Sequence, residues 1–443
     1  MSEKTINRNL VVVGAILIQL CLGAIYAWSV FTKKLTVPLD EGGDYGFSAT
    51  QTAWVFSAGL ATFAVFMVIA GRLQAKLGPR PIAVVGGIVL GIGYILGGFL
   101  GKTFIAQLVC IGFIGGAGIG LAYVVPIAVG VKWFPDKKGM IAGLAVAGFG
   151  FGATLWVKLA GSWFGGLLNT TNLFGLPGVQ SVFVIYGIVF AALVLLGSIV
   201  MVNPPAGYKP AGWEPPAPTA GGAATGAIDL TSGEMLKTPQ FYMLWLMFLG
   251  SALAGLMVIY CIRLFGVDAL QASGAVEGED AAKLAGEWAG TAMALYAILN
   301  GLGRIIWGTI SDVIGRKTSL IAMCVAQSLI MFAFYYMGGS TIGLVVGACI
   351  IGFNFGGNFA LFATATADYF GNKNVGTNYG WVFLAYGLAG IVGPQVAGYF
   401  KDAAKGGDVA AWFTPFVIAG VACAIAAVIG LALKPPKVKA AVE

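Results

Sequence analysis

Long apolar runs separated by short polar segments make up most of this sequence. A helix needs about 20 apolar residues to cross the hydrocarbon core of a bilayer. Twelve runs are long enough, and their apolar residues are continuous rather than alternating, which disfavours a β-barrel. We therefore predict an all-α integral membrane protein with transmembrane helices at residues 10–32, 50–73, 81–100, 103–131, 140–163, 180–202, 240–266, 288–311, 318–337, 340–367, 377–400 and 410–433.

One long segment interrupts this pattern and divides the chain. Residues 203–238 are rich in Pro, Gly and Ala, too polar to span a membrane and too poor in large apolar residues to form a core. We predict a six-helix bundle at 1–202, a cytoplasmic linker at 203–238 and a second six-helix bundle at 239–443. The first apolar run is too long for a cleaved signal peptide.

Composition supports a membrane protein and excludes several classes of chemistry. Hydrophobic residues make up 58% of the chain and charged residues 10%, whereas soluble proteins carry roughly 25% charged residues. The sequence contains no histidine, which excludes His-ligated metals, Ser-His catalysis and imidazole proton relays. The six cysteines fall within apolar runs, as buried free thiols do. We expect no cofactor, no metal and no enzymatic activity.

The basic residues indicate orientation rather than nucleic-acid binding. The net charge is +7, and most Lys and Arg residues fall in alternate loops, which the positive-inside rule places in the cytoplasm. These loops include Arg72 to Arg80, Lys132 to Lys138 and Arg316 to Lys317. We expect both termini to be cytoplasmic and the protein to lie in the cell (inner) membrane.

Two loops recur in the second half of the sequence. GRLQAKLGPR (Gly71 to Arg80) returns as GTISDVIGRK (Gly308 to Lys317), a shift of 237 residues. VKWFPDKKG, which begins at Val131, has a weaker echo in ADYFGNKNVG, which begins at Ala367. Two loops repeated at one offset indicate duplicated six-helix units, the design of transporters whose halves rock about a central site.

The repeated loop resembles the signature of the major facilitator superfamily, roughly G-x-x-x-D-R-x-G-R-K/R. The second copy matches it with Asp312, Gly315, Arg316 and Lys317, whereas the first has Ala75 at the acidic position and Pro79 in place of an arginine. The resemblance implies a gating motif formed by Gly71, Gly78, Arg80, Gly308, Asp312, Gly315 and Arg316.

Within the superfamily, the chain is most similar to the oxalate/formate antiporter family, which is related to the monocarboxylate transporters. The similarity rests on LGAIYAWSVF, KWFPDKKG, GRIIWGTISD, FNFGG and NYGWVFLAYGLAGIVGP. It implies a carboxylate permease in which Arg304 of the eighth span binds the anion. Oxalate exchangers of the family resemble this chain but carry a lysine where it has Tyr386, which points away from oxalate and towards a monocarboxylate.

The residues themselves also single out Arg304. It lies in an apolar span, where a charge costs several kcal/mol, and Asn300 lies one turn earlier on the same helix face. A guanidinium can donate two parallel hydrogen bonds to a carboxylate. Arg304 could instead extend to the headgroups or pair with Asp312, and Asn300 could be a packing amide.

Aromatic residues of other spans are candidates for substrate contact or for simple packing. They are Tyr26, Tyr123, Phe355, Phe359, Phe383 and Tyr386. We expect a monomeric carrier of a small monocarboxylate such as lactate, pyruvate or formate, driven by proton symport or anion exchange. The alternatives are an oxalate/formate-type dicarboxylate antiporter, which would need a second cation, and a membrane sensor or channel, for which the linker is too small to be a signalling domain.

Overall fold

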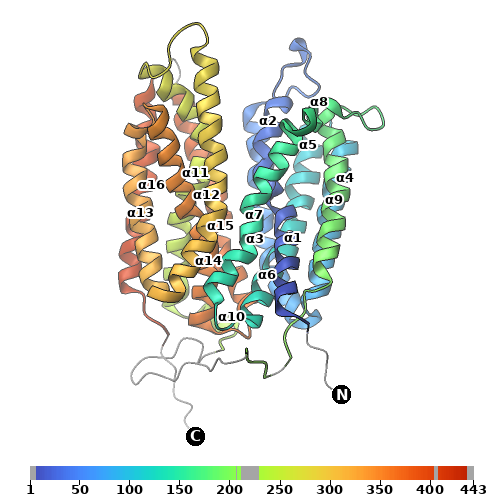
Figure 1. The fold of residues 1–443 in the computed structure, drawn as a ribbon, viewed down its shortest axis with the longest axis vertical. Coiled ribbons are helices and arrows are strands. Elements are labelled where there is room, and N and C mark those ends of the chain that lie inside the picture. The colour runs from blue at the N-terminus through green and yellow to red at the C-terminus, as the bar shows by residue number, and fades with distance from the viewer. Residues whose placement is uncertain (1–5, 206, 211–228, 404–407, 437–443) are drawn as a thin grey trace. The chain divides into compact units, whose positions relative to one another are not determined.

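The computed structural model describes residues 6–205, 207–210, 229–403 and 408–436, and its described part is helical (Figure 1). Its α-helices are α1 (Arg8–Leu22), α2 (Trp28–Leu35), α3 (Ala49–Leu77), α4 (Pro79–Leu100), α5 (Phe104–Gln107), α6 (Gly116–Trp133), α7 (Lys138–Gly161), α8 (Leu167–Thr170), α9 (Gly178–Ser198), α10 (Ser232–Met235), α11 (Pro239–Ala272), α12 (Ala281–Ile314), α13 (Arg316–Met337), α14 (Thr341–Phe370), α15 (Val375–Ala403) and α16 (Phe413–Ala432). The segments η1 (Gly23–Ala27), η2 (Leu39–Glu41), η4 (Trp163–Gly165) and η5 (Val409–Trp412) are short 3₁₀-helices, and η3 (Leu108–Gly115) is a π-helix.

The predicted membrane spans are confirmed. In the described part of the chain, twelve helical segments are long and apolar enough to cross a membrane, and each coincides with a predicted run. The observed helices differ chiefly at their ends. For example, α11 and α12 each contain 34 residues and extend beyond the apolar runs that predicted them.

Residue contacts divide the chain into two compact units. Unit 1 comprises Met1–Asp136, Leu144–Trp213 and Asn374–Gly387, and unit 2 comprises Lys137–Gly143, Glu214–Lys373 and Leu388–Glu443. This division follows spatial contacts. It therefore assigns the first residues of α7 to unit 2 and the first half of α15 to unit 1, unlike a division by sequence order alone.

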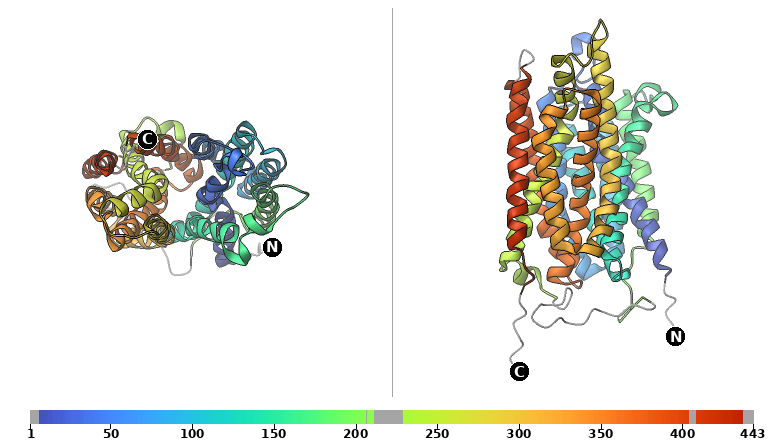
Figure 2. Two further views of the ribbon diagram at one scale, coloured as in Figure 1. Left: turned by 90° about the horizontal axis from the view of Figure 1, so that it is seen from above. Right: turned by 60° about the vertical axis from the view of Figure 1, so that its left-hand side comes forward.

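Unit 1 is a helix bundle in which α4 packs against α6 and α9, and α3 packs against α6 (Figures 1 and 2). Glycines bring these helices close together. A Cβ atom added at Gly91 would lie 2.8 Å from the carbonyl oxygen of Gly187, and one added at Gly118 would lie 2.3 Å from the backbone nitrogen of Leu90. Small residues at such contacts are typical of helices that pack within a membrane.

Unit 2 is also a helix bundle, in which α12 and α14 touch backbone to backbone. A Cβ atom at Gly303 would lie 2.0 Å from the carbonyl oxygen of Phe353, and one at Gly356 would lie 2.0 Å from that of Asn300. Gly352 has the same relationship to Tyr296, at 2.4 Å. This close approach brings side chains of α12 near the aromatic residues of α14.

Much of the predicted linker, residues 206 and 211–228, lies outside the described residues. Its end is ordered by hydrogen bonds within unit 2. Leu230 N–H donates to the carbonyl of Phe370, and Lys373 N–H donates to Asp229. Thr231 and Glu234 form a capping box at α10, and the hydrogen bonds from Thr231 lower the pKa of Glu234.

Candidate functional site: a buried arginine and two aromatic groups

Arg304 is fully buried in unit 2. Its side chain has 0% exposure, and it is the sole charged residue that counts as buried among those the structure describes. Burying a charge costs several kcal/mol even after the surroundings relax. Asp312, the next acidic residue along α12, is engaged elsewhere by Arg316 and by two backbone amides. The structure thus argues against the alternative that Arg304 is present to pair with Asp312.

Asn300 holds the Arg304 guanidinium in a fixed orientation. Its Oδ1 atom accepts hydrogen bonds from Arg304 Nε at 3.1 Å and from Arg304 Nη2 at 3.0 Å. Both residues belong to α12, where positions four apart lie on one face. Two of the five guanidinium N–H groups are used in this way. The predicted proximity of the two side chains is confirmed, and it takes the form of two hydrogen bonds to one acceptor atom.

Phe359 of α14 covers one face of the same guanidinium. The central carbon of the Arg304 guanidinium lies 4.0 Å from the ring centroid, well within cation–π range. Phe355 packs edge-on against Phe359, with centroids 5.3 Å apart, and does so from the same helix. Asn300, Arg304, Phe355 and Phe359, four of the predicted site residues, are therefore grouped in unit 2.

Two more amides on α14 lie in this region of unit 2. Asn354 Oδ1 accepts a hydrogen bond from Trp307 Nε1 of α12 at 3.3 Å. Asn358 is fully buried, and neither of its amide atoms has a hydrogen-bond partner. Asn354 therefore contacts α12 three residues beyond Arg304.

The other four predicted site residues are grouped in unit 1. The hydroxyl groups of Tyr26 and Tyr386 are hydrogen-bonded at 2.5 Å, although the two residues are 360 positions apart in sequence. Phe383 packs against Tyr386, with centroids 4.7 Å apart, and against Tyr123, at 5.3 Å. All four side chains are buried. The structure thus brings the eight predicted residues together as two groups of four, one in each unit.

Two phenylalanines join the aromatic group of unit 1 and were not predicted. Phe63 of α3 contacts Tyr123, Phe383 and Tyr386, with centroids 4.9–5.9 Å apart. Phe149 of α7 packs against Tyr26, Tyr123 and Phe63. The 237-residue repeat contained a signal for both, since it relates Phe63 to Asn300 and Phe149 to Tyr386.

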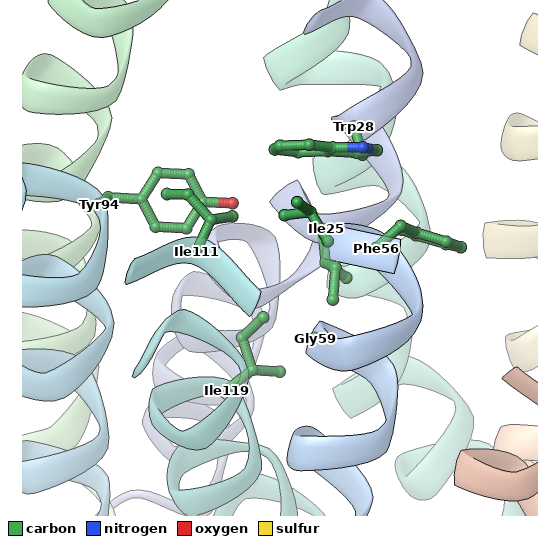
Figure 3. A pocket seen from close by; sticks show the side chains of 8 residues that line it. Ile25, Trp28, Phe56, Gly59, Tyr94, Ile111 and Ile119 are labelled. Carbon is green, nitrogen blue, oxygen red and sulfur yellow. The ribbon is translucent and has the colours of Figure 1, made fainter. Parts of the chain in front are cut away.

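A small apolar pocket in unit 1 is separate from these residues (Figure 3). It is lined by Ile25, Trp28, Val55, Phe56, Gly59, Tyr94, Ile111 and Ile119. Its volume, ≈10 Å³, has room for about one water molecule, far less than a carboxylate substrate requires. The pocket therefore does not supply the binding site.

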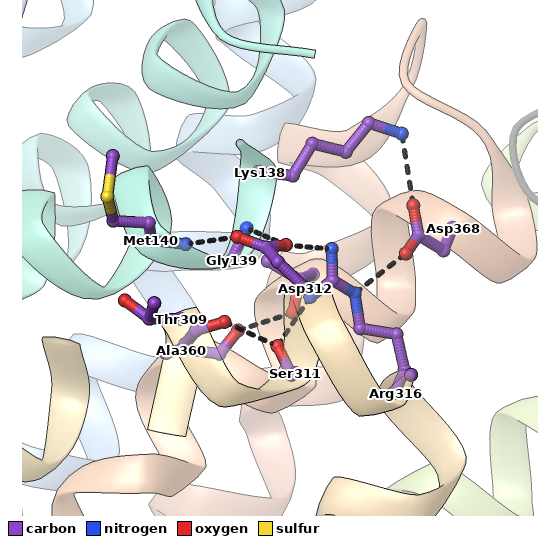
Figure 4. A network of polar contacts seen from close by, with 12 residues as sticks. Lys138, Gly139, Met140, Thr309, Ser311, Asp312, Arg316, Ala360 and Asp368 are labelled. Carbon is purple, nitrogen blue, oxygen red and sulfur yellow. Dashed lines mark hydrogen bonds and ion pairs between the residues drawn. The ribbon is translucent and has the colours of Figure 1, made fainter. Parts of the chain in front are cut away.

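A network of charged side chains connects α7, α12, α13 and α14 within unit 2 (Figure 4). Asp312 accepts hydrogen bonds from the backbone amides of Gly139 and Met140, both at 2.9 Å, and thus caps the N-terminus of α7. Arg316 pairs with Asp312 at 2.7 Å and with Asp368 at 2.8 Å. Lys138 pairs with Asp368 at 3.0 Å.

The glycines of the predicted gating motif have equivalent positions in the two units. Gly78 and Gly315, at the ends of α3 and α12, have φ angles of 83° and 85°, which strongly favour glycine. A Cβ atom at Gly71 would lie 2.4 Å from the carbonyl of Gly376, and one at Gly308 would lie 2.2 Å from that of Gly139. The backbone geometry of the motif is thus repeated.

The polar chemistry of the motif differs between the units. At the first copy, Thr377 Oγ1 donates to the carbonyl of Gly71 at 2.8 Å. Arg80 donates to the carbonyl of Ile199. Ala75 stands where the second copy has Asp312, so no carboxylate at that position can cap α15 as Asp312 caps α7. The second copy of the motif therefore contains ion pairs, whereas Thr377 and Arg80 at the first copy donate to backbone carbonyls.

Comparison with known proteins places this arrangement in a family. The family model described as "Major Facilitator Superfamily" matches residues 10–394 and 280–443, which together include most of the chain. The chain belongs to the Major Facilitator Superfamily. The all-helical fold with twelve candidate spans agrees with this assignment, and the family membership predicted from the signature loop is confirmed.

Two curated proteins and one solved structure are similar to this chain over most of their length. The oxalate:formate antiporter of Oxalobacter formigenes is 25% identical over 393 residues, with 87% of this chain and 83% of that protein covered. The apicoplast pyruvate carrier 1 of Toxoplasma gondii is 25% identical over 444 residues, covering 84% and 80%. The structure of the proton:xylose symporter XylE has a TM-score of 0.64 at 14% identity, covering 95% and 94%. The last similarity confirms the superfamily fold. The protein is thus a transporter rather than an enzyme.

Proposed function

We propose that this transporter carries a small monocarboxylate anion of the lactate, pyruvate or formate type, and that Arg304 binds its carboxylate. The observation that carries the proposal is the fully buried guanidinium, held by Asn300 and covered by Phe359. A carboxylate would occupy the edge of the guanidinium formed by Nη1 and Nη2, since Asn300 takes the edge formed by Nε and Nη2. Relatives named as an oxalate:formate antiporter and a pyruvate carrier support a carboxylate substrate.

The charge of the site favours one carboxylate over two. Arg304 is the only Lys or Arg that is buried among the described residues, and the two other intramembrane bases, Lys158 and Arg263, are exposed. Tyr386 stands where the resemblance implies a lysine in oxalate exchangers, and its hydroxyl is bonded to Tyr26. The alternative, a dicarboxylate antiporter of the oxalate/formate type, would leave the second carboxylate without a buried cation.

The aromatic group of unit 1 has a separate role in the proposal. Tyr26, Tyr123, Phe383 and Tyr386 line the path of the anion through that unit, and the phenol groups supply hydrogen bonds within an otherwise apolar surface. Mostly apolar walls with a few polar groups are typical of sites for small molecules.

Arg304 also supplies a basis for coupling binding to alternating access. Without an anion, the guanidinium is an excess positive charge in a medium of low dielectric, and complete closure would raise its desolvation cost. A bound carboxylate neutralises the charge and lowers that cost. The loaded carrier therefore closes and reopens more readily than the empty one, which favours obligatory exchange or proton-coupled uptake of the anion.

The remaining charges bear on the coupling ion and on the gate. The sequence has no histidine, and its acidic residues fall in loops or near helix ends, so protons would have to travel with the substrate or through an acid at a helix end.

We propose that the Asp312–Arg316–Asp368 network acts as a gate by stabilising one conformation of the transport cycle. We further propose an inner-membrane location with both termini cytoplasmic and a monomer as the working unit, in agreement with the distribution of basic residues.

Uptake by proteoliposomes that contain the purified protein tests the proposal. Labelled lactate, pyruvate, formate and oxalate are offered with and without a pH gradient, and with and without an internal counter-anion. We expect uptake of at least one monocarboxylate, and no uptake of oxalate at the same concentration. Stimulation by an internal anion would indicate exchange, and stimulation by an inward proton gradient would indicate symport. Oxalate uptake faster than that of every monocarboxylate would favour the dicarboxylate alternative.

A further inference from the structure

Arg263 of α11 is a second arginine within the membrane-spanning part of unit 2. It lies in the apolar span Pro239–Ala272, and its side chain is exposed, whereas that of Arg304 is fully buried. A charge within an apolar span is costly, so a charged residue there indicates a functional site. The residues assigned to the site above do not include Arg263.

Arg263 carries a positive charge that no carboxylate of the described residues neutralises. It takes part in none of the ion pairs within the described part of the chain. Asp268, the nearest acidic residue along α11, accepts a hydrogen bond from Trp412 Nε1 at 2.9 Å. Because a guanidinium stays charged at any relevant pH, Arg263 presents a permanent cation on α11.

Other helices of unit 2 cover the remaining sides of α11. Gly255 packs against α14, Gly250 packs against α16, and Met257 packs against the second half of α15. Arg263 is exposed on the side that these contacts leave open. The guanidinium is therefore accessible to an anion.

The internal repeat relates Arg263 to Tyr26. The two positions are 237 residues apart, the offset that relates the two copies of the gating motif. Tyr26 belongs to the aromatic group of unit 1, which we assigned to the path of the anion. By this equivalence, Arg263 occupies the corresponding position of unit 2 and places a cation there.

Helix packing keeps the same offset. In unit 1, Trp156 Nε1 of α7 donates a hydrogen bond to the carbonyl of Leu20 at 2.7 Å. The positions 237 residues later are Gly393 and Met257, and a Cβ atom added at Gly393 would lie 3.1 Å from the Met257 nitrogen. The equivalence of Arg263 and Tyr26 thus rests on contacts as well as on sequence.

A contact between α11 and α12 defines the level of Arg263 relative to Arg304. The Tyr296 hydroxyl donates to the carbonyl of Gly255 at 3.1 Å. The two helices are consecutive and antiparallel (Figure 1), and each arginine follows its residue of this contact by eight positions. With a rise of 1.5 Å per residue, the two Cα atoms lie about 20–25 Å apart along the helix axes.

This separation gives the two cations different tasks. It is too large for one small carboxylate to contact both at once. Side chains lean toward the N-terminus of their own helix, so on antiparallel helices Arg263 and Arg304 lean toward each other. An anion therefore contacts the two guanidinium groups in succession.

We propose that Arg263 is an entry site for carboxylate anions, from which the anion passes to Arg304. This inference rests on the proposed function, since it takes Arg304 as the central site and the end of α11 far from the linker as the outer end. An exposed cation attracts anions from solution and holds them weakly. Weak binding at the entry allows the anion to leave for the buried guanidinium.

The test measures exchange from each side of the membrane. Right-side-out and inside-out vesicles from cells that produce the full chain are loaded with saturating unlabelled pyruvate, and labelled pyruvate is offered outside. Rates in vesicles without the protein are subtracted. We expect Arg263→Gln to raise the half-saturation concentration by roughly 3- to 5-fold in right-side-out vesicles, as for the loss of one exposed charge interaction. The value in inside-out vesicles should be unchanged.

Charge variants and a second base provide the controls. Arg263→Lys keeps the charge and should stay close to the wild type, whereas Arg263→Glu repels the anion and should exceed the effect of Arg263→Gln. Lys158 of α7 is also exposed within an apolar span, but the repeat does not relate it to a site residue. Lys158→Gln should leave the half-saturation concentration unchanged on both sides.

The results that overturn the inference differ from those that overturn the proposed function. Unchanged half-saturation in both Arg263→Gln and Arg263→Glu overturns the entry site, since a side chain that contacts only lipid headgroups gives this result. An equal increase on both sides of the membrane, or an equal increase in Lys158→Gln, also overturns it. Failure of the wild type to exchange pyruvate, lactate and formate overturns the proposed function, and the entry site with it.

Discussion

The guanidinium of Arg304 on α12 lies over the ring of Phe359 on α14, with its central carbon 4.0 Å from the ring centroid. The contact depends on the close approach of the two helices at Gly303 and Gly356. A desolvated cation–π contact contributes about 2 kcal/mol, and its geometry also restrains the plane of the guanidinium.

Replacing this ring should weaken substrate binding. We expect Phe359→Leu to raise the dissociation constant for pyruvate by roughly 3- to 30-fold, since the guanidinium loses an attractive surface and part of its orientation. Phe359→Trp should stay closer to the wild type. Phe362→Leu serves as the control, because Phe362 stacks on Phe248, at 4.5 Å, as part of the core. Equal affinities in Phe359→Leu and the wild type would contradict the role of the ring.

The hydroxyl pair of Tyr26 and Tyr386 should behave as a single unit. A buried hydrogen bond contributes about 0.5–1.5 kcal/mol, and removal of either hydroxyl breaks the hydrogen bond between the two side chains. We expect Tyr26→Phe, Tyr386→Phe and the double variant to lower the thermal stability by similar amounts. Melting curves of the three purified variants measure this, and additive losses would show that the two hydroxyls act independently.

Much of the fold could be predicted from the sequence. Backbone amides and carbonyls must be hydrogen-bonded within a bilayer, so an apolar run of about 20 residues allows little besides a helix. The relationship between Asn300 and Arg304 could also be predicted, because helical geometry places residues four apart on one face.

Contacts between distant helices could not be predicted in the same way. The repeat relates Phe63 to Asn300 and Phe149 to Tyr386, but a repeat contains no distances. The aromatic group around Phe63 depends on how α3, α6, α7 and α15 pack, and this packing is set by many glycine contacts at once. The orientation of the Asn300 amide likewise follows only from its observed hydrogen bonds.

Asp312 should affect the rate of transport more than affinity. It holds the N-terminus of α7 and Arg316, and it does not contact the residues assigned to the substrate. In Asp312→Asn, the amide nitrogen would face a backbone donor and the pair with Arg316 would be lost. We expect the maximal uptake rate to change at least 5-fold while the dissociation constant for pyruvate stays within about 3-fold.

A second aspartate provides the control for this experiment. Asp136 forms a longer pair with Arg8, at 3.3 Å compared with 2.7 Å for Asp312 and Arg316, and its arginine is more exposed, at 34% compared with 10%. Partly exposed pairs of this kind contribute little. Asp136→Asn should therefore transport at a rate close to the wild type. A larger change in the maximal uptake rate for Asp136→Asn than for Asp312→Asn would contradict the gating role proposed for the Asp312–Arg316–Asp368 network.

Gly308 should be intolerant of even a methyl group. An added Cβ atom would lie 2.2 Å from the carbonyl oxygen of Gly139, so α12 and the start of α7 would have to separate. We expect Gly308→Ala to destabilise the protein by about 1–3 kcal/mol, seen as a lower melting temperature. Gly286→Ala, in the same helix with open space around it, should be neutral or slightly stabilising.

Substrate counterflow with Arg304 variants tests the central claim most directly. Proteoliposomes loaded with unlabelled pyruvate are diluted into labelled pyruvate, and wild type, Arg304→Lys and Arg304→Gln are compared at equal reconstitution and equal elution in size-exclusion chromatography. Arg304→Gln should abolish counterflow, because no charge neutralises the carboxylate. Arg304→Lys should reduce it by about 10-fold or more, because a point charge replaces the planar fork. Counterflow undiminished in both variants would contradict the assignment of Arg304 as the carboxylate site.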